Sequence, residues 1–390
     1  MSSNRYDVIV VGGGIVGTSL AVALRQRGQS VALLERAAIG GGTTARSFAW
    51  INATAKTADQ RYHRLNAAGL ARYQALAAEF GEHAIGLRPD GMLWCAPDGE
   101  VDRLAELRSR ADALAGFGYP VTWLEATDLK AMEPHVAWSD RAVGLYAMAD
   151  AWIDAPAFAR FQADRLREAG ATVCEQRPAT ALLLDDDGTV RGVDCADGAM
   201  HAAKVVLTCG PDINDVLAEL TGFEAFAARF PVQRAAGLLV TTPDDETRRF
   251  ARHILYLEGA QSMHLRATPG GGLLLGADDT DGMVSEDPGD ASCRRAALKL
   301  LERAQRYLPA FRGPELIDGC RLDVGVRAVP ADGMSIVGAM PGSPGLYVVA
   351  THSGVTLALA LAEWMADAVV HGDIAEEIAP FNLERFQGFA

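Results

Sequence analysis

The 390-residue sequence contains few cysteines and no long apolar run, and acidic residues outnumber basic ones. Its 36 lysine and arginine residues against 50 aspartate and glutamate residues give a net charge of −14, which argues against nucleic acid or an anionic membrane surface as an electrostatic partner. None of the six cysteines has C-x-x-C spacing, so neither a metal site nor a redox dithiol is expected. A membrane span needs about 18 apolar residues, which no run approaches, and the amino terminus lacks the basic region of a signal peptide. We therefore expect a cytoplasmic protein with reduced thiols.

The first 36 residues have the pattern of a dinucleotide-binding βαβ unit. The apolar run Tyr6–Val11 is typical of a buried parallel strand, and Gly12–Gly17 follows at once as G-x-G-x-x-G. Residues 18–27 predict a helix, residues 30–34 predict a second strand, and Glu35 stands at its end. A glycine-rich turn in another α/β protein is the alternative. Dinucleotide binding is favoured because the strand, the glycine motif, the helix, the second strand and the acidic residue all occur in the required order and spacing.

Each residue type in this unit has a mechanical role. Gly12 allows the tight turn, Gly14 lets the backbone approach a pyrophosphate, and Gly17 lets the helix pack closely on the strand. The helix N-terminus, which includes Ile15 and Val16, directs free N–H groups at the phosphates. A carboxylate at Glu35 accepts hydrogen bonds from ribose hydroxyls and repels a 2′-phosphate, so the pattern disfavours NADP.

Three further segments have the character of a cofactor site. Residues 36–52 combine glycines, hydroxyls and arginine with Phe48 and Trp50, which suits a loop around a phosphate-bearing cofactor better than a plain surface loop. Residues 203–208 form an apolar strand that stops at a small-residue turn, as the third parallel strand of a nucleotide fold does. A strand at residues 345–350 leads through another such turn into a helix, which creates a second positively polarised helix N-terminus.

These patterns predict a mixed α/β fold. Nucleotide-type βα units occupy residues 1–50 and 145–220, and strand-rich material lies between and after them. Long helices are expected at residues 58–80, 101–114, 155–168 and 293–307. The two kinds of material alternate along the chain, so the domains are expected to interleave.

Three segments together resemble the D-amino acid oxidase family of flavoproteins, which includes glycine oxidase, sarcosine oxidase and bacterial D-amino acid dehydrogenase. They are the N-terminal motif, Arg327 in a G-x-R context ahead of Pro330–Gly333, and the segment Gly345–Gly354. The resemblance covers nearly the whole chain and is strongest at both ends. It implies bound FAD, a Rossmann-type FAD-binding domain interleaved with an antiparallel-sheet substrate domain, and oxidation of an amino acid at its C–N bond.

The resemblance also implies domain boundaries and a set of cofactor contacts. The FAD-binding domain is expected to comprise residues 1–85, 145–220 and 320–390, and the substrate domain residues 86–144 and 221–319. The cysteine that holds flavin covalently in sarcosine oxidases falls at Gly325, so FAD is expected to bind non-covalently. The implied FAD contacts are Gly12, Gly14, Ile15, Val16, Gly17, Glu35, Arg36, Thr43, Thr44, Ser47, Phe48, Ala49, Trp50, Ala179, Thr208, Gly210, Ser353, Gly354, Val355 and Thr356.

Oxidation of an amino acid by hydride transfer requires a clamp for the substrate carboxylate and an α-hydrogen that points at flavin N5. Arg327 is the predicted clamp, because a guanidinium grips a carboxylate bidentately; a structural ion pair with Asp323 or Asp332 is the alternative. His352 is a catalytic candidate that would assist the N-terminus of the last helix in stabilising negative charge on the reduced flavin. The candidate substrate contacts are Trp50, Tyr256, His264 and Arg266.

The electron acceptor is indicated by a missing lysine. Leu274 occupies the place of the lysine that promotes the reaction with oxygen in sarcosine oxidases, and the lysines of this chain, Lys56, Lys130, Lys204 and Lys299, lie elsewhere in the sequence. This favours a dehydrogenase that passes electrons to a quinone or another acceptor, with oxygen as the alternative.

The leading hypothesis is therefore an FAD enzyme that oxidises a small D-configured or N-substituted amino acid to an imine, which hydrolyses to a keto acid. A second hypothesis is a flavin-holding subunit of a larger amino-acid dehydrogenase complex, in contact with another protein or with the membrane periphery. A third is a nicotinamide-dependent protein. The presence of one dinucleotide fingerprint, without a second for a nicotinamide partner, favours flavin over the third.

Overall fold

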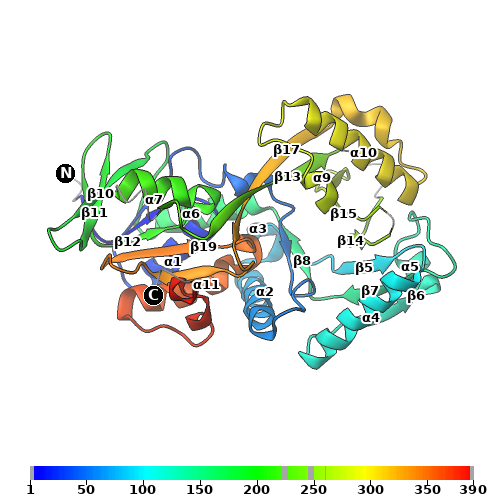
Figure 1. Cartoon of the computed structure of the whole chain (residues 1–390), viewed down its shortest axis with the longest axis horizontal. Coiled ribbons are helices and arrows are strands. Elements are labelled where there is room, and N and C mark those ends of the chain that lie inside the picture. Colours follow the sequence, from blue (N-terminus) through cyan, green and yellow to red (C-terminus); the bar gives the residue numbers. More distant parts are fainter. Residues whose placement is uncertain (1–3, 222–226, 245–249, 260, 387–390) are drawn as a thin grey trace.

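The computed structural model describes residues 4–221, 227–244, 250–259 and 261–386. Two lobes, each built on its own large sheet, lie side by side (Figure 1). The long strands β13 (Val232–Thr241) and β17 (Arg321–Pro330) extend from one lobe towards the other. The chain crosses between the lobes several times, which is the interleaving that the sequence predicted.

The first sheet has a parallel core with the topology of a nucleotide-binding fold. Its strands are adjacent in the order β9 (Thr172–Cys174), β2 (Val31–Leu34), β1 (Arg5–Val11), β12 (Met200–Leu207) and β19 (Leu346–Ala350), all parallel to their neighbours. Antiparallel strands β11 (Val190–Cys195) and β10 (Ala179–Leu184) extend it beside β12, and β18 (Ile336–Ala339) pairs with β19.

Both faces of this sheet are covered, which explains why its central strands are continuous apolar runs. Residues 8–11 and 31–34 are buried throughout. On one face lie α1 (Ile15–Gln26), α6 (Ala155–Glu168) and α11 (Gly354–His371), and on the other lies α7 (Ile213–Thr221). Each large side chain buried in this way contributes about 1.5–3 kcal/mol to stability.

The second sheet forms the other lobe. Its order is β17, β13, β16 (Leu273–Gly276), β15 (Met263–Ala267), β14 (Ile254–Leu257), β5 (Met92–Ala96), β7 (Val143–Ala147) and β6 (Thr122–Glu125). Its pairings are antiparallel except for the parallel pair β14–β5, so the expected antiparallel sheet has one exception. A parallel pair is possible here because β5 and β14 are far apart in the sequence, so that no hairpin joins them.

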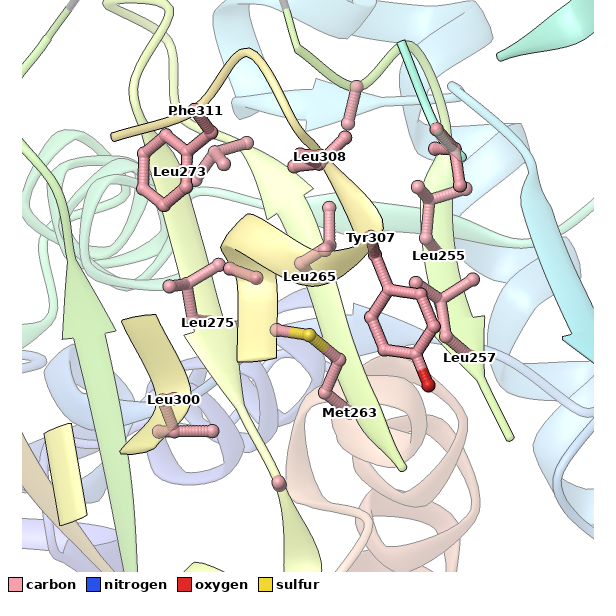
Figure 2. Close-up of a cluster of buried hydrophobic side chains, with 14 of the residues drawn as sticks. Leu255, Leu257, Met263, Leu265, Leu273, Leu275, Leu300, Tyr307, Leu308 and Phe311 are labelled. Atoms are coloured by element: carbon pink, nitrogen blue, oxygen red, sulfur yellow. The ribbon is translucent and has the colours of Figure 1, made fainter. Parts of the chain in front are cut away.

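Helix α10 (Ala291–Tyr307) covers one face of the second sheet. Its buried residues recur at helical spacing, with Cys293, Ala296, Leu300, Ala304 and Tyr307 among them. Figure 2 shows Tyr307 and the following Leu308 and Phe311 packed over leucines of β14, β15 and β16. This apolar contact holds the helix against the sheet.

The remaining elements connect or flank the two lobes. A small antiparallel sheet of β3 (Trp50–Ile51), β8 (Ala151–Ile153) and β4 (Leu87–Arg88) lies between them. In the described ranges the other helices are α2 (Gln60–Phe80), α3 (Glu82–Ile85), α4 (Val101–Gly116), α5 (Ala126–Met132) and α9 (Asp278–Asp281). The 3-10 turns are η1 (Thr43–Arg46), η2 (Gly210–Asp212), η3 (Gly313–Gly319), η4 (Ala379–Phe381) and η5 (Leu383–Arg385).

Two expectations differ from the structure. Strand β17 belongs to the second sheet, because it pairs with β13 along its whole length, although residues 320–390 were assigned to the FAD-binding domain. Helix α11 is 18 residues long with a mean hydropathy of 1.3, long and apolar enough to cross a membrane, contrary to the expectation that no run qualifies. It packs against α1 and α2, and 56% of it is buried, as in the core helix of a two-layer fold.

Candidate active site

A cavity of about 520 Å³ lies where the two sheets meet, at the carboxyl ends of β1, β2, β12 and β19. This is the edge of a doubly wound sheet at which ligands bind. The predicted residues that line it are Gly12, Gly14, Ile15, Val16, Glu35, Arg36, Thr43, Thr44, Ser47, Phe48, Ala49, Trp50, Ala179, Thr208, Gly210, Tyr256, His264, Arg327, His352, Ser353, Gly354, Val355 and Thr356. Two predicted contacts, Gly17 and Arg266, are not part of the lining.

The glycine motif forms the first wall, and its conformation requires glycine. Gly12 has φ +110°, and a Cβ there would lie 2.6 Å from the carbonyl oxygen of Thr208. A Cβ on Gly17 would lie 1.9 Å from the carbonyl oxygen of Gly12, so Gly17 serves the close approach of helix to strand. Gly14 is the N-cap of α1 and presents bare backbone to the cavity, with Thr44 Oγ1 accepting from the Ile15 N–H at 3.1 Å.

Glu35 lies at the end of β2 as predicted, and its carboxylate also fixes the turn. Its Oε2 accepts from the Gly13 N–H at 2.7 Å and its Oε1 from the Ala37 N–H at 2.8 Å. Each oxygen retains a second lone pair for ribose hydroxyls. The neighbouring Arg36 pairs with Asp212 of η2 at 2.5 Å.

The loop from Gly42 to Trp50 passes across the cavity and is attached to both lobes. Thr43 Oγ1 donates to the carbonyl of Val326 in β17 at 2.6 Å. Ala49 has φ 56°, a left-handed conformation that is costly for a residue with a Cβ, and Ser47 Oγ accepts from its N–H at 3.0 Å. Strained residues of this kind cluster at ligand sites. Ala49 lies between Phe48 and Trp50, which both line the cavity.

The N-terminus of α11 forms the inner end of the cavity. Ser353 occupies the N-cap without a side-chain cap bond, so the first N–H groups of the helix keep their hydrogen-bonding capacity. Thr356 Oγ1 donates to the carbonyl of Trp50 at 3.1 Å and accepts from the Asn52 N–H at 3.2 Å, which holds this helix end against the loop. A helix N-terminus in this position favours a negative charge.

His352 lines the cavity just before α11 and is kept neutral. Burial, with nearby positive charges on Lys56 and Arg327, lowers the pKa of His352 to about 4. At neutral pH the imidazole can donate and accept hydrogen bonds but contributes no charge.

Arg327 of β17 faces the cavity in an ion pair that the sequence did not predict. Its NH2 group donates to Asp281 Oδ2 at 2.6 Å and to the carbonyl of Ala236 at 3.3 Å. The two partners considered from sequence are wrong, because Asp323 pairs with Arg321 and Asp332 with Arg385. Burial raises the pKa of Asp281, and the adjacent Arg327 opposes this shift.

Aromatic rings form the wall beside this pair. Tyr256 stacks on Trp94 at 4.3 Å between ring centroids and on His264 at 5.8 Å, and the Trp50 ring lies 6.3 Å from Tyr256. The hydroxyl of Tyr256 donates to Asp278 Oδ2 at 2.9 Å. Burial lowers the pKa of His264 to about 4, so this ring is also neutral.

Arg266 does not reach the cavity, which corrects the prediction that it contacts substrate. Its Nε donates to the carbonyl of Phe48 at 3.0 Å, and its guanidinium lies over the Trp152 ring at 3.8 Å. The Phe48 ring contacts both His264 and Arg266. Arg266 therefore supports Phe48 from behind the cavity wall.

Sequence reasoning missed several lining residues. Asp278 and Asp281 lie on the four-residue helix α9, which has no recognisable motif, and Trp94 lies in β5, on the other lobe from the glycine motif. Lys56 also lines the cavity, although the sequence gives it no predicted role at the site, whereas Leu274 does not line it. The sequence feature that could have indicated Lys56 is its position as a single lysine in a run of small residues that follows the predicted cofactor loop.

The structure also bears on covalent and metal chemistry at the site. Among the described lining residues the single cysteine is Cys209, at the end of β12, where burial raises its thiol pKa to about 12. No group of three or more His, Cys, Asp or Glu in the described part of the chain is arranged to hold a metal ion.

Comparisons with known proteins agree on one family. Residues 7–368 match the family model described as FAD dependent oxidoreductase. A glycine oxidase from Geobacillus kaustophilus (strain HTA426) is 27% identical over 406 aligned residues, which cover 99% of this chain and 98% of the relative. A subunit of opine oxidase from Agrobacterium tumefaciens (strain Ach5) is 24% identical, with 98% of each chain covered.

Solved structures show the same fold. A crystal structure of glycine oxidase from Geobacillus kaustophilus has a TM-score of 0.81 at 24% identity and covers 98% of this chain and 100% of that one. A crystal structure of L-proline dehydrogenase from P. horikoshii also has a TM-score of 0.81, at 19% identity, with 97% of each chain covered.

Proposed function

Because the chain belongs to the FAD-dependent oxidoreductase family and is an FAD enzyme acting on amino acids or amines, we propose that its substrate is a small D-configured or N-substituted amino acid. The α-carbon loses a hydride, the nitrogen loses a proton, and the resulting imine is hydrolysed to a keto acid and an amine. The likeness to a glycine oxidase along the whole chain supports this proposal.

The residues of the cavity fit FAD. The pyrophosphate would be held by the bare backbone at Gly14, the free N–H groups of α1 and the hydroxyl groups of the turn η1. The adenosine ribose would be held by Glu35. The segment from Ser47 to Trp50 and the N-terminus of α11 would border the flavin ring. When bound, FAD supplies the acceptor for the hydride. We infer non-covalent binding, because Gly325 offers no attachment and the lining cysteine is at the β12 end of the cavity.

The Arg327–Asp281 pair is the observation that carries the choice of substrate class. Asp281 uses one NH2 contact of the guanidinium, and the carbonyl of Ala235 lies 3.5 Å from Nε, which leaves NH1 for a substrate carboxylate. Asp281 and Asp278 place negative charge nearby, where an ammonium group would be attracted. Opposite charges on neighbouring groups suit a zwitterion, which they hold in one orientation.

The aromatic wall complements this charge pair. Trp50, Trp94 and Tyr256 offer apolar ring surface to a small side chain or an N-alkyl group. Water is excluded from this part of the cavity when a substrate covers the rings, which strengthens the charge contacts.

Anaerobic bleaching of the flavin tests the proposal directly. The purified holoenzyme is mixed without oxygen with D-, L- and N-methyl amino acids and with amines that lack a carboxylate. We expect bleaching by D- or N-methyl amino acids and little by the decarboxylated amines. Equal bleaching by the matched amines would show that the enzyme does not recognise the substrate carboxylate.

A second candidate is a flavin-holding component of a larger dehydrogenase. The alignment of the whole chain with one subunit of an opine oxidase favours it. An assay of the chain alone with an artificial dye acceptor separates the two: turnover supports the self-sufficient enzyme, and bleaching without turnover supports the component of a complex. For either candidate we propose a cytoplasmic location, supported by the six cysteines, all of which are free thiols.

A further inference from the structure

We propose that Lys56 supplies the positive charge that balances the negative charge gained by the flavin ring when substrate is oxidised, in concert with the N-terminus of α11. The inference rests on the use of FAD at this site and is independent of which amino acid is the substrate. It assigns a function to a residue that sequence reasoning had set aside.

The backbone holds Lys56 in a fixed place between β3 and α2. Its N–H donates to the carbonyl of Ala53 at 3.0 Å, and its own carbonyl lies 3.2 Å from His63 Nδ1. The side chain then extends to the cavity, where its Nζ lies 5.7 Å from the centroid of the Tyr62 ring. Lys56 therefore lines the site from a backbone position that these hydrogen bonds fix.

No carboxylate forms an ion pair with this ammonium group in the part of the chain that the structure describes. Burial lowers the pKa of Lys56, which reflects the cost of a cation without a counter-ion. The other lining cations differ: Arg36 pairs with Asp212, Arg177 with Asp197 and Arg327 with Asp281. Arg46, the last residue of η1, is exposed to solvent. A partly buried cation without a counter-ion is most stable when an anion occupies the cavity.

Lys56 and the N-terminus of α11 face the same end of the cavity. The Tyr62 hydroxyl, on the ring that Lys56 covers, lies 3.4 Å from Oγ of Ser353, the N-cap of α11. Among the charged groups that lower the pKa of His352, which precedes that cap, Lys56 has the largest effect. Because His352 is neutral, it cannot supply the charge itself.

The chemistry of the reaction requires a charge of this sign. A hydride carries two electrons and one proton, so its acceptance makes the ring system one unit more negative. A cation and a helix N-terminus already in place lower the free energy of that anion without reorganisation. Lys56 is therefore a positioning charge for the cofactor, and it need not touch the substrate.

The role of Lys56 is tested by two measurements on the purified holoenzyme, the affinity of its flavin for sulfite and the midpoint potential of its flavin. Neither measurement needs a substrate. Sulfite adds to oxidised flavin and leaves the ring negative, so it reports on the same charge. In Lys56→Met we expect sulfite binding to weaken by about tenfold or more, and the potential to fall by about 30 mV, the equivalent for a two-electron couple. Flavin content is expected to stay near parental.

Two variants provide controls. Lys56→Arg keeps the charge and is expected to retain most of the sulfite affinity. Lys130→Met removes an exposed lysine that pairs with Asp140 at 2.6 Å, and should change neither quantity. Should Lys56→Met fold poorly, Lys56→Gln offers a polar neutral replacement.

In neutral Lys56 variants, a sulfite affinity within about twofold of the parent and a midpoint potential within about 9 mV of it would overturn the proposal, since the expected changes are about tenfold and about 30 mV. An increase in KM for the amino acid with both quantities unchanged would also overturn it and would assign Lys56 to the substrate carboxylate. Failure of every amino acid to bleach the flavin would refute only the proposed substrate class, because the sulfite result stands without it.

Discussion

Replacing Arg327 by alanine is the most informative single perturbation of this site. The substitution removes the proposed contact with the substrate carboxylate. It also leaves Asp281, whose side chain is 15% exposed, without its 2.6 Å partner. Two effects are therefore expected, one on catalysis and one on stability, and they can be measured separately.

The size of the catalytic effect follows from the chemistry of the pair. Deleting one partner of a desolvated, hydrogen-bonded charge pair costs about 2–5 kcal/mol. At about 1.4 kcal/mol per factor of ten, kcat/KM should fall by about thirty- to several-thousand-fold. Flavin content should remain near parental, because Arg327 is assigned to substrate. Arg327→Lys should recover only part of the loss, since lysine keeps the charge but its single ammonium group cannot contact Asp281 and the substrate carboxylate through two separate nitrogens, as the guanidinium does.

The double variant Arg327→Ala/Asp281→Asn separates the two effects. It also removes the Asp281 carboxylate, which has no ion-pair partner in Arg327→Ala. Thermal stability should therefore recover relative to Arg327→Ala, while activity stays low. Asp281→Asn alone measures the contribution of the aspartate. The assay is steady-state kinetics on an amino acid and on the amine that lacks its carboxylate; the amine should be a poor substrate of the parent and should lose little further in Arg327→Ala.

Near-parental kcat/KM of Arg327→Ala on an amino acid would refute the clamp. Loss of flavin from this variant, or a loss of activity that the double variant reverses, would show that the ion pair with Asp281 is purely structural.

Three other outcomes are expected. Gly14→Val should release FAD, because a Cβ there already meets Thr44 Oγ1 at 3.3 Å and a larger side chain fills the pyrophosphate position; a variant that stays fully loaded, judged by its visible spectrum, would contradict the phosphate assignment. Burial raises the pKa of Asp150 to about 7, above its value of about 3.9 in unfolded chains, so stability should decrease as pH rises from about 4 to 7 and then level off. Asp150→Asn should flatten this dependence in thermal unfolding followed across that range, and an unchanged slope would count against it. Reduced enzyme should be reoxidised slowly by air and faster by a soluble quinone in stopped-flow measurements, whereas rapid peroxide formation would identify an oxidase.

The sequence by itself determined the dinucleotide-binding half of the site. The G-x-G-x-x-G motif, the strands around it and Glu35 are contiguous, and local backbone rules link each residue to its place. The structure confirms this βαβ unit, with Gly12 at φ +110° and Glu35 bonded to the turn. The resemblance at both ends of the chain identified the family for the same reason, since those motifs are short and local.

Only the tertiary structure decided which residues form the proposed substrate-binding part of the cavity. Arg327 meets Asp281, 46 residues away, because β17 pairs with β13 and brings α9 over the cavity. Arg266 and His264 occupy the same strand two residues apart, yet only His264 lines the cavity, with the Phe48 ring in contact with both. Lys56 reaches the site because the loop before α2 is fixed by His63 and directed at the N-terminus of α11. Each of these outcomes depends on contacts between segments distant in the chain, for which neither periodicity nor a local motif carries a signal.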